Sequence, residues 1–103
     1  MPQSYSTLSA RQSGADALQA ELAEEKAGSL GRMGRRVEAA MGELNASPHD
    51  TASSEHVALV KAAARAVWAY FVQCEMCGVF NHRDAIVVYG IPKEVLVRLG
   101  ASG

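Results

Sequence analysis

The sequence predicts an all-α protein: two long antiparallel helices plus two short C-terminal helices, completed as a bundle by dimerisation. Three observations support this fold class. Of the 103 residues, 18 are Ala and three are Pro, a composition that favours helix over sheet. Apolar residues recur at helical spacing along two long segments. The β-rich run at residues 86–89 has no second run with which it could pair.

Length and composition are those of one small domain. Hydrophobic residues make up 49% of the chain and the net charge is −1, so the chain can bury a core. We expect residues 1–12 to form a flexible tail and residues 13–103 a single helical domain. No secretory signal is evident, and the longest uncharged apolar stretch, residues 66–74, is far below the roughly 20 residues that cross a bilayer. We therefore expect a cytoplasmic protein without membrane contact.

The first long helix is predicted to begin at Ser13, an N-cap residue with Asp16 in the first turn, and to end near Leu44. Asn45 and Pro48 stop it. Its apolar residues fall near one face: Leu18, Leu22, Leu30, Met33, Val37, Met41 and Leu44. At about 30 residues it would be some 45 Å long, which exceeds the width of a compact domain of this size.

Glycines inside this helix allow two interpretations. Each interior Gly costs about 1 kcal/mol relative to Ala, so the helix could break near Gly28 and Ser29. Alternatively, Gly28, Gly31, Gly34 and Gly42 could form a smooth strip that lets another helix approach closely. We favour the continuous helix, because the apolar stripe continues past the glycines in register.

A loop over residues 45–53 precedes the second long helix, which Ser53 or Ser54 caps and which ends near Cys77, with Gly78 after it. A heptad-like seam runs along it, made of Val57, Val60, Ala64, Val67, Phe71, Cys74 and Gly78. The opposite side is also largely apolar. A helix of this kind is buried on most sides, so we expect it to be the central helix.

Two short helices complete the chain. Asn81 is predicted to cap a helix over residues 82–89 that stops at Gly90. Pro92 then occupies the first position of a helix over residues 93–99.

The last third of the chain carries a resemblance. Residues 81–100 read NHRDAIVVYGIPKEVLVRLG and follow AYFVQ at residues 69–73. This segment resembles a family of short uncharacterised proteins from α-proteobacteria, a domain of unknown function. The resemblance implies a bacterial source, a helical fold and no assigned activity.

Cys74 and Cys77 form a C-x-x-C pair whose usual roles are redox chemistry and metal binding. A redox pair usually opens a helix, where the helix dipole lowers the pKa of the first thiol, whereas this pair closes one. A zinc site would need His82 and either His49 or His56 as further ligands, and no second closely spaced pair is present. We therefore expect reduced structural thiols and no metal site.

No catalytic motif is evident. The chain contains neither H-E-x-x-H nor a G-x-S-x-G elbow, and its glycines are not followed by the Lys-Ser/Thr of a phosphate loop. We expect no enzyme, no catalytic residue and no cofactor.

The alternative function is a DNA-binding regulator that uses residues 82–99 as a helix-turn-helix. Its second helix offers Lys93 and Arg98, but its face is otherwise mostly apolar, and the net charge provides no basic patch for a nucleic acid.

Charge segregation in the first helix predicts self-association. Three glutamates precede Gly28 and three arginines follow it. If two copies cross antiparallel between Gly28 and Ser29, residue i faces residue 57 − i, and acidic groups meet basic groups. The predicted interface comprises Glu21, Leu22, Glu25, Gly28, Ser29, Leu30, Arg32, Met33 and Arg36. We therefore expect a homodimeric structural or interaction module without catalysis.

Overall fold

The computed structural model describes residues 3–47 and 52–100. Within these ranges the chain forms four helices and no strand: α1 (Gln3–Ala46), α2 (Ser54–Met76), α3 (Arg83–Tyr89) and α4 (Lys93–Leu96). The predicted all-helical class, with two long and two short helices, is confirmed. Residues 1–2 of the expected tail, and residues 48–51 of the expected loop with His49, lie outside the described residues.

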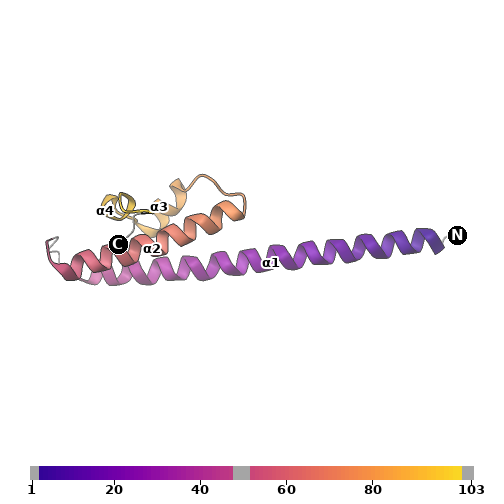
Figure 1. Cartoon of the computed structure of the whole chain (residues 1–103), viewed down its shortest axis with the longest axis horizontal. Helices are drawn as coiled ribbons and strands as arrows, with labels where there is room; N and C mark the ends of the chain where they lie inside the picture. The colour runs from indigo at the N-terminus through magenta and orange to yellow at the C-terminus, as the bar shows by residue number, and fades with distance from the viewer. Residues whose placement is uncertain (1–2, 48–51, 101–103) are drawn as a thin grey trace.

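The helix α1 runs without interruption through all of its glycines (Figure 1). The interpretation of one continuous helix is therefore confirmed. Its expected start at Ser13 is wrong, since the helix already includes Gln3. Neither Gly nor Pro lies between these two residues, so nothing in this segment breaks the helix before the expected cap.

The helix α2 begins and ends where its capping residues predict. The Ser53 hydroxyl accepts a hydrogen bond from the backbone N–H of His56 at 3.0 Å, which satisfies one free donor of the first turn. At the other end, Gly78 has φ +86°, and the N–H of Val79 donates to the carbonyl of Cys74 at 2.8 Å. This left-handed Gly closes the helix in a Schellman motif.

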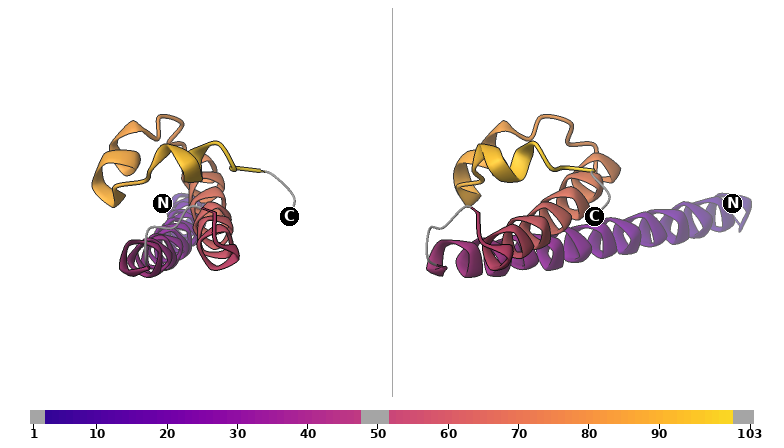
Figure 2. Two further views of the ribbon diagram at one scale, coloured as in Figure 1. Left: turned by 90° about the vertical axis from the view of Figure 1, so that its left-hand side faces the viewer. Right: turned by 60° about the vertical axis from the view of Figure 1, so that its left-hand side comes forward.

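The core lies between α1, α2 and the C-terminal segment. Its buried members are Val37, Met41 and Leu44 of α1, Val60, Ala63, Ala64, Val67 and Phe71 of α2, and Ile91 and Val95 near the C-terminus. The two short helices cover one face of the α1–α2 pair (Figure 2). The pair and the short helices therefore form two layers.

The expectation that α2 is buried on most sides needs correction. The middle of its seam, from Val60 to Cys74, is buried as predicted, while Val57 is half-buried and Gly78 is exposed. On the other side, Trp68, Val72 and Met76 are 50%, 39% and 61% exposed. The helix packs against α1 and α4, and the short helices cover one side only. The sequence pattern identified apolar residues all round α2, but α1 and the short helices leave part of this surface exposed.

The C-terminal helices differ from their predicted bounds mainly in α4, which ends at Leu96 rather than at Leu99. Pro92 is the N-cap of α4 instead of its first helical residue. Beyond Leu96 the chain continues in tight turns, with a hydrogen bond from the N–H of Arg98 to the carbonyl of Val95 at 3.1 Å. Gly90 ends α3 with φ 61°, as its position predicted.

The molecule is elongated, with extents of 75 × 24 × 20 Å. The reason is the unequal length of its two long helices, which have 44 and 23 residues. The Cys77 Sγ atom contacts the carbonyl oxygen of Lys26 at 3.9 Å, so α2 reaches back along α1 only to about this point. The preceding part of α1 projects from the body (Figure 1).

Candidate functional site

The projecting part of α1 is the first candidate for a functional surface. Every residue from 14 to 28 is exposed. Leu18 and Leu22 lie in this segment and are 58% and 54% exposed. An elongated apolar and charged surface of this kind is typical of an interaction site.

The predicted interface residues divide into two groups. Glu21, Leu22, Glu25, Gly28, Arg32 and Arg36 are exposed, whereas Ser29, Leu30 and Met33 are half-buried. Half-burial arises because these three residues lie where α2 begins to flank α1. The end of α2, near Lys26, divides the predicted interface: Glu21, Leu22 and Glu25 lie on the projecting part of α1, and the other six residues lie beyond that point.

Two of the predicted ionic residues contact each other within the chain. Arg32 Nη2 donates to Glu25 Oε1 at 3.3 Å, with both side chains largely exposed. In the predicted crossing, each of these two side chains would instead face a residue of a second copy. The observed contact shows that the two side chains lie on one face of α1. An exposed pair of this kind contributes only about 0–1 kcal/mol.

The cysteine pair lies where α2 meets α1. Cys74 is buried and Cys77 is half-buried. Burial raises the pKa of the Cys74 thiol, and the nearby Cys77 and Glu75 add to the rise, while a hydrogen bond with Tyr70 opposes it. A raised pKa keeps the thiol protonated at neutral pH, which disfavours the thiolate that redox and metal chemistry require.

The histidines considered as zinc ligands have other contacts. His56 Nε2 lies 3.1 Å from Glu94 Oε2, joining the start of α2 to α4. The His82 ring stacks on Phe71 with the ring centroids 4.1 Å apart. In the part of the chain that the structure describes, no three His, Cys, Asp or Glu side chains cluster as metal ligands would.

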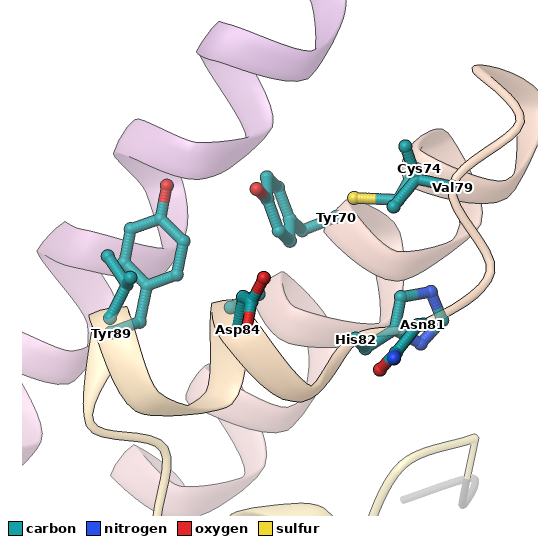
Figure 3. A pocket seen from close by; sticks show the side chains of 9 residues that line it. Tyr70, Cys74, Val79, Asn81, His82, Asp84 and Tyr89 are labelled. Atoms are coloured by element: carbon teal, nitrogen blue, oxygen red, sulfur yellow. The ribbon is translucent and has the colours of Figure 1, made fainter.

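A pocket of about 260 Å³ opens beside Cys74, between the end of α2 and α3 (Figure 3). It is lined by Tyr70, Cys74, Val79, Asn81, His82, Asp84, Ala85, Val88 and Tyr89. The Tyr70 and Tyr89 rings meet edge to face with their centroids 5.4 Å apart. Burial raises the pKa of the Tyr70 hydroxyl, and the neighbouring Cys74 raises it further by a smaller amount. Neutral phenol and thiol groups can donate hydrogen bonds, but neither Tyr70 nor Cys74 is activated as a nucleophile.

No pattern in the sequence indicates this pocket. One of its lining residues, Tyr89, packs against Gly34 of α1, where a Cβ atom would lie 2.6 Å from the Tyr89 hydroxyl. A glycine within a helix indicates a close approach, but its partner lies 55 positions along the chain, and no local pattern links the two residues. The His56–Glu94 contact was missed for the same reason.

The segment proposed for DNA binding forms two very short helices. α4 has four residues, and its Val95 is fully buried. A recognition helix presents several side chains to the major groove, and α4 offers few. DNA binding stays a prediction, tested by a mobility shift with duplex DNA at low salt, where binding should be strongest.

The family comparison covers nearly the whole chain. A model of a family of unknown function, DUF6665, matches residues 6–103. The chain belongs to DUF6665. This confirms the prediction that the chain belongs to an uncharacterised family. The match extends beyond the C-terminal third that carries the resemblance described above. No curated protein and no solved structure matches this DUF6665 chain. Its α-proteobacterial origin stays a prediction.

Proposed function

We propose that the protein is a non-catalytic interaction module that acts as a homodimer through α1. The observation that carries this proposal is the projecting part of α1, which is exposed throughout residues 14–28. An isolated helix is only marginally stable in water unless it packs against another element. A partner helix would supply that packing, and it would cover Leu18 and Leu22.

The charges of α1 favour an antiparallel partner of the same sequence. In a crossing between Gly28 and Ser29, Glu21 faces Arg36 of the second copy and Glu25 faces its Arg32. A two-fold axis repeats each contact. A parallel pair would place glutamates against glutamates. Because exposed ion pairs contribute little energy, they select the orientation, and the apolar side chains supply most of the stability.

The experiment inverts these charges in two stages. The variant Glu21→Arg/Glu25→Arg and the variant Arg32→Glu/Arg36→Glu each place like charges at the crossing. Each should raise the dimer dissociation constant by about tenfold or more in analytical ultracentrifugation, since four repulsive contacts replace four attractive ones. The variant that carries all four substitutions restores the opposite charges, and it should dimerise as the wild type does. Monomeric wild-type protein at every concentration would overturn the proposal.

A second test uses two exposed glycines as a matched pair. At each of Gly28 and Gly31, a Cβ atom would have only an arginine head group within 4 Å, at 3.5 Å. Gly28 lies at the proposed crossing, whereas Gly31 is about 60° round the helix from Gly28 and almost opposite Ser29. Gly28→Leu should therefore weaken the dimer more than Gly31→Leu does.

A cytoplasmic location is part of the same proposal. By length and composition, α2 is the one helix among the described residues that could cross a membrane. Its buried seam packs against α1 and α4, as the core helix of a water-soluble protein does. Cell fractionation with an epitope-tagged chain tests the location.

A further inference from the structure

The α1–α2 pair has a second face, which α3 and α4 leave uncovered (Figure 2). On α1, Gly34 faces Tyr89 of α3, so the residues on the opposite flank of the helix point away from the short helices. On α2, Phe71 stacks on His82 next to α3. Residues about half a turn from Phe71 point the other way.

We call this second surface the open face, and helical geometry assigns its members. They include Ser29, Met33, Arg36 and Ala40 of α1, with Ala62, Ala69, Gln73 and Met76 of α2. Ala40, Ala62 and Ala69 are half-buried, while Met76 is exposed. The three alanines carry small side chains, so the open face is shallow between its two helices.

The exposed leucines of the projecting segment lie on the same flank of α1 as the open face. Leu22 precedes Ser29 by seven residues, and Ser29 precedes Arg36 by seven. Seven residues are almost two full turns of a helix, so the three positions share one side. Leu18, four residues before Leu22, lies next to them. One flank of α1 thus carries large apolar side chains before Gly28, and the open face after it.

We infer that the open face receives Leu18 and Leu22 of a second copy, so that the α1–α2 pairs of two chains form a four-helix core with α3 and α4 on the outside. This inference rests on the proposed antiparallel homodimer and specifies which surface α1 contacts. In the proposed crossing, Leu18 lies opposite residue 39 of the second copy, beside its Ala40. Leu22 lies opposite residue 35.

The position of α2 places its alanines under the same leucines. Cys77 contacts Lys26, and a Cβ atom on Gly34 would lie 3.5 Å from the Tyr70 ring. These two contacts set the register of the antiparallel pair, and they place Ala69 beside residue 35 of α1. Leu22 of one copy therefore lies over Ala69 of the other, where a small side chain leaves room for it. Met76 lies next to the crossing point, where it faces Met76 of the second copy.

Length also favours a second copy of this chain as the occupant. The helical segment of α1 that precedes Lys26, residues 3–25, has 23 residues, the same number as α2. Each segment is therefore about 35 Å long. A projecting segment of this length spans the whole open face of its partner, and the partner's segment does the same in return. Both halves of the contact are thus present in one chain.

The first experiment is disulfide cross-linking in a background of Cys74→Ala and Cys77→Ser. With Leu22→Cys and Ala69→Cys added, mild oxidation should give a covalent dimer on a non-reducing gel. The control combines Leu22→Cys with Val88→Cys, which lies on α3 in the other layer and is 76% exposed. The control pair should remain monomeric on the gel at the same protein concentration.

The second experiment places a charge on the open face. Ala69→Glu and Met76→Glu should each raise the dimer dissociation constant by about tenfold or more, because the contact would bury an unpaired carboxylate. Met76 is 61% exposed, so its substitution leaves the monomer folded. Val88→Glu is the matched control and should not change the constant.

The outcomes separate this inference from the proposal on which it rests. Wild-type protein that sediments as a monomer overturns both. A dimer that responds to the α1 charge inversions, but neither cross-links through positions 22 and 69 nor weakens with Met76→Glu, overturns only the inference. In that case the open face is free for another partner. A cross-link that forms only between 22 and 69, together with a weakened Met76→Glu dimer, supports it.

Discussion

Gly34 is a residue of α1 at which the two layers approach closely. A Cβ atom there would lie 2.6 Å from the Tyr89 hydroxyl and 3.5 Å from the Tyr70 ring. At Gly42, also inside α1, a Cβ atom would meet nothing within 4 Å. We expect Gly42→Ala to stabilise the protein by about 0.5–1 kcal/mol through helix propensity. Gly34→Ala should lose that gain and destabilise by about 1–3 kcal/mol through overcrowding. Urea denaturation measures both, and equal effects would contradict the close contact.

The two cysteines should differ in reactivity. Cys74 is buried and has a raised pKa, so at pH 7–8 it should react with iodoacetamide at least about tenfold more slowly than Cys77. The single-cysteine variants Cys77→Ser and Cys74→Ala separate the two rates. Because the pKa of Cys74 is raised in the folded state, its contribution to stability is present below the ordinary thiol pKa and is lost as the pH rises through the raised value. A fast reaction at Cys74 would contradict the burial.

At this scale, the sequence predicts contacts that are local and misses those that are distant. Residue types next to an apolar run predict the cap of α2 at Ser53 and the helix ends at Gly78 and Gly90. The contacts His56–Glu94 and Gly34–Tyr89 join residues far apart in the chain. Their residue types are common at many positions, so only the fold determines which side chains meet.

At the scale of elements, α2 should dominate stability. Phe71 is 7% exposed in its seam, whereas Phe80 in the following loop is 73% exposed. Replacing Phe71 by Ala should cost about 3–5 kcal/mol, as for a buried aromatic side chain. The same change at Phe80 should cost less than about 0.5 kcal/mol. Thermal and urea unfolding of the two variants provide the comparison. Similar losses would show that the seam does not carry the core.

Element types were predictable because apolar spacing is a strong signal in long helices. The bounds of α2 follow from its caps at both ends. The start of α1 was not predictable, because Ser13 is a good cap residue that the helix nevertheless incorporates. The end of α4 depends on Val95, whose burial against the core fixes one turn, after which the chain turns away. The uncovered side of α2 depends on where the other helices pack. The spacing of apolar residues along α2 does not contain this information.

At the scale of the whole molecule, shape provides a test of assembly. The Cα radius of gyration is 20.3 Å, whereas a compact domain of this length has about 13 Å. In small-angle scattering, the proposed dimer should have twice the monomer mass but a maximum dimension only roughly 10–15 Å greater, since the two α1 helices overlap almost completely. Gly28→Leu provides the monomer reference. An end-to-end dimer would instead be nearly twice as long.

Because α1 is longer than α2, the helicity of its projecting segment would depend on the protein concentration if the chain dimerises as proposed. In a single chain, residues 14–25 have only their own backbone hydrogen bonds and exposed side chains to keep them helical, and a helix of this kind unravels readily. In the proposed dimer, association would remove that freedom, so pairing would be in part a folding step. The cellular concentration of the protein would then set how much of α1 is helical and how long this segment survives a protease. A cell that makes more of the chain would then also make a larger share of it fully folded.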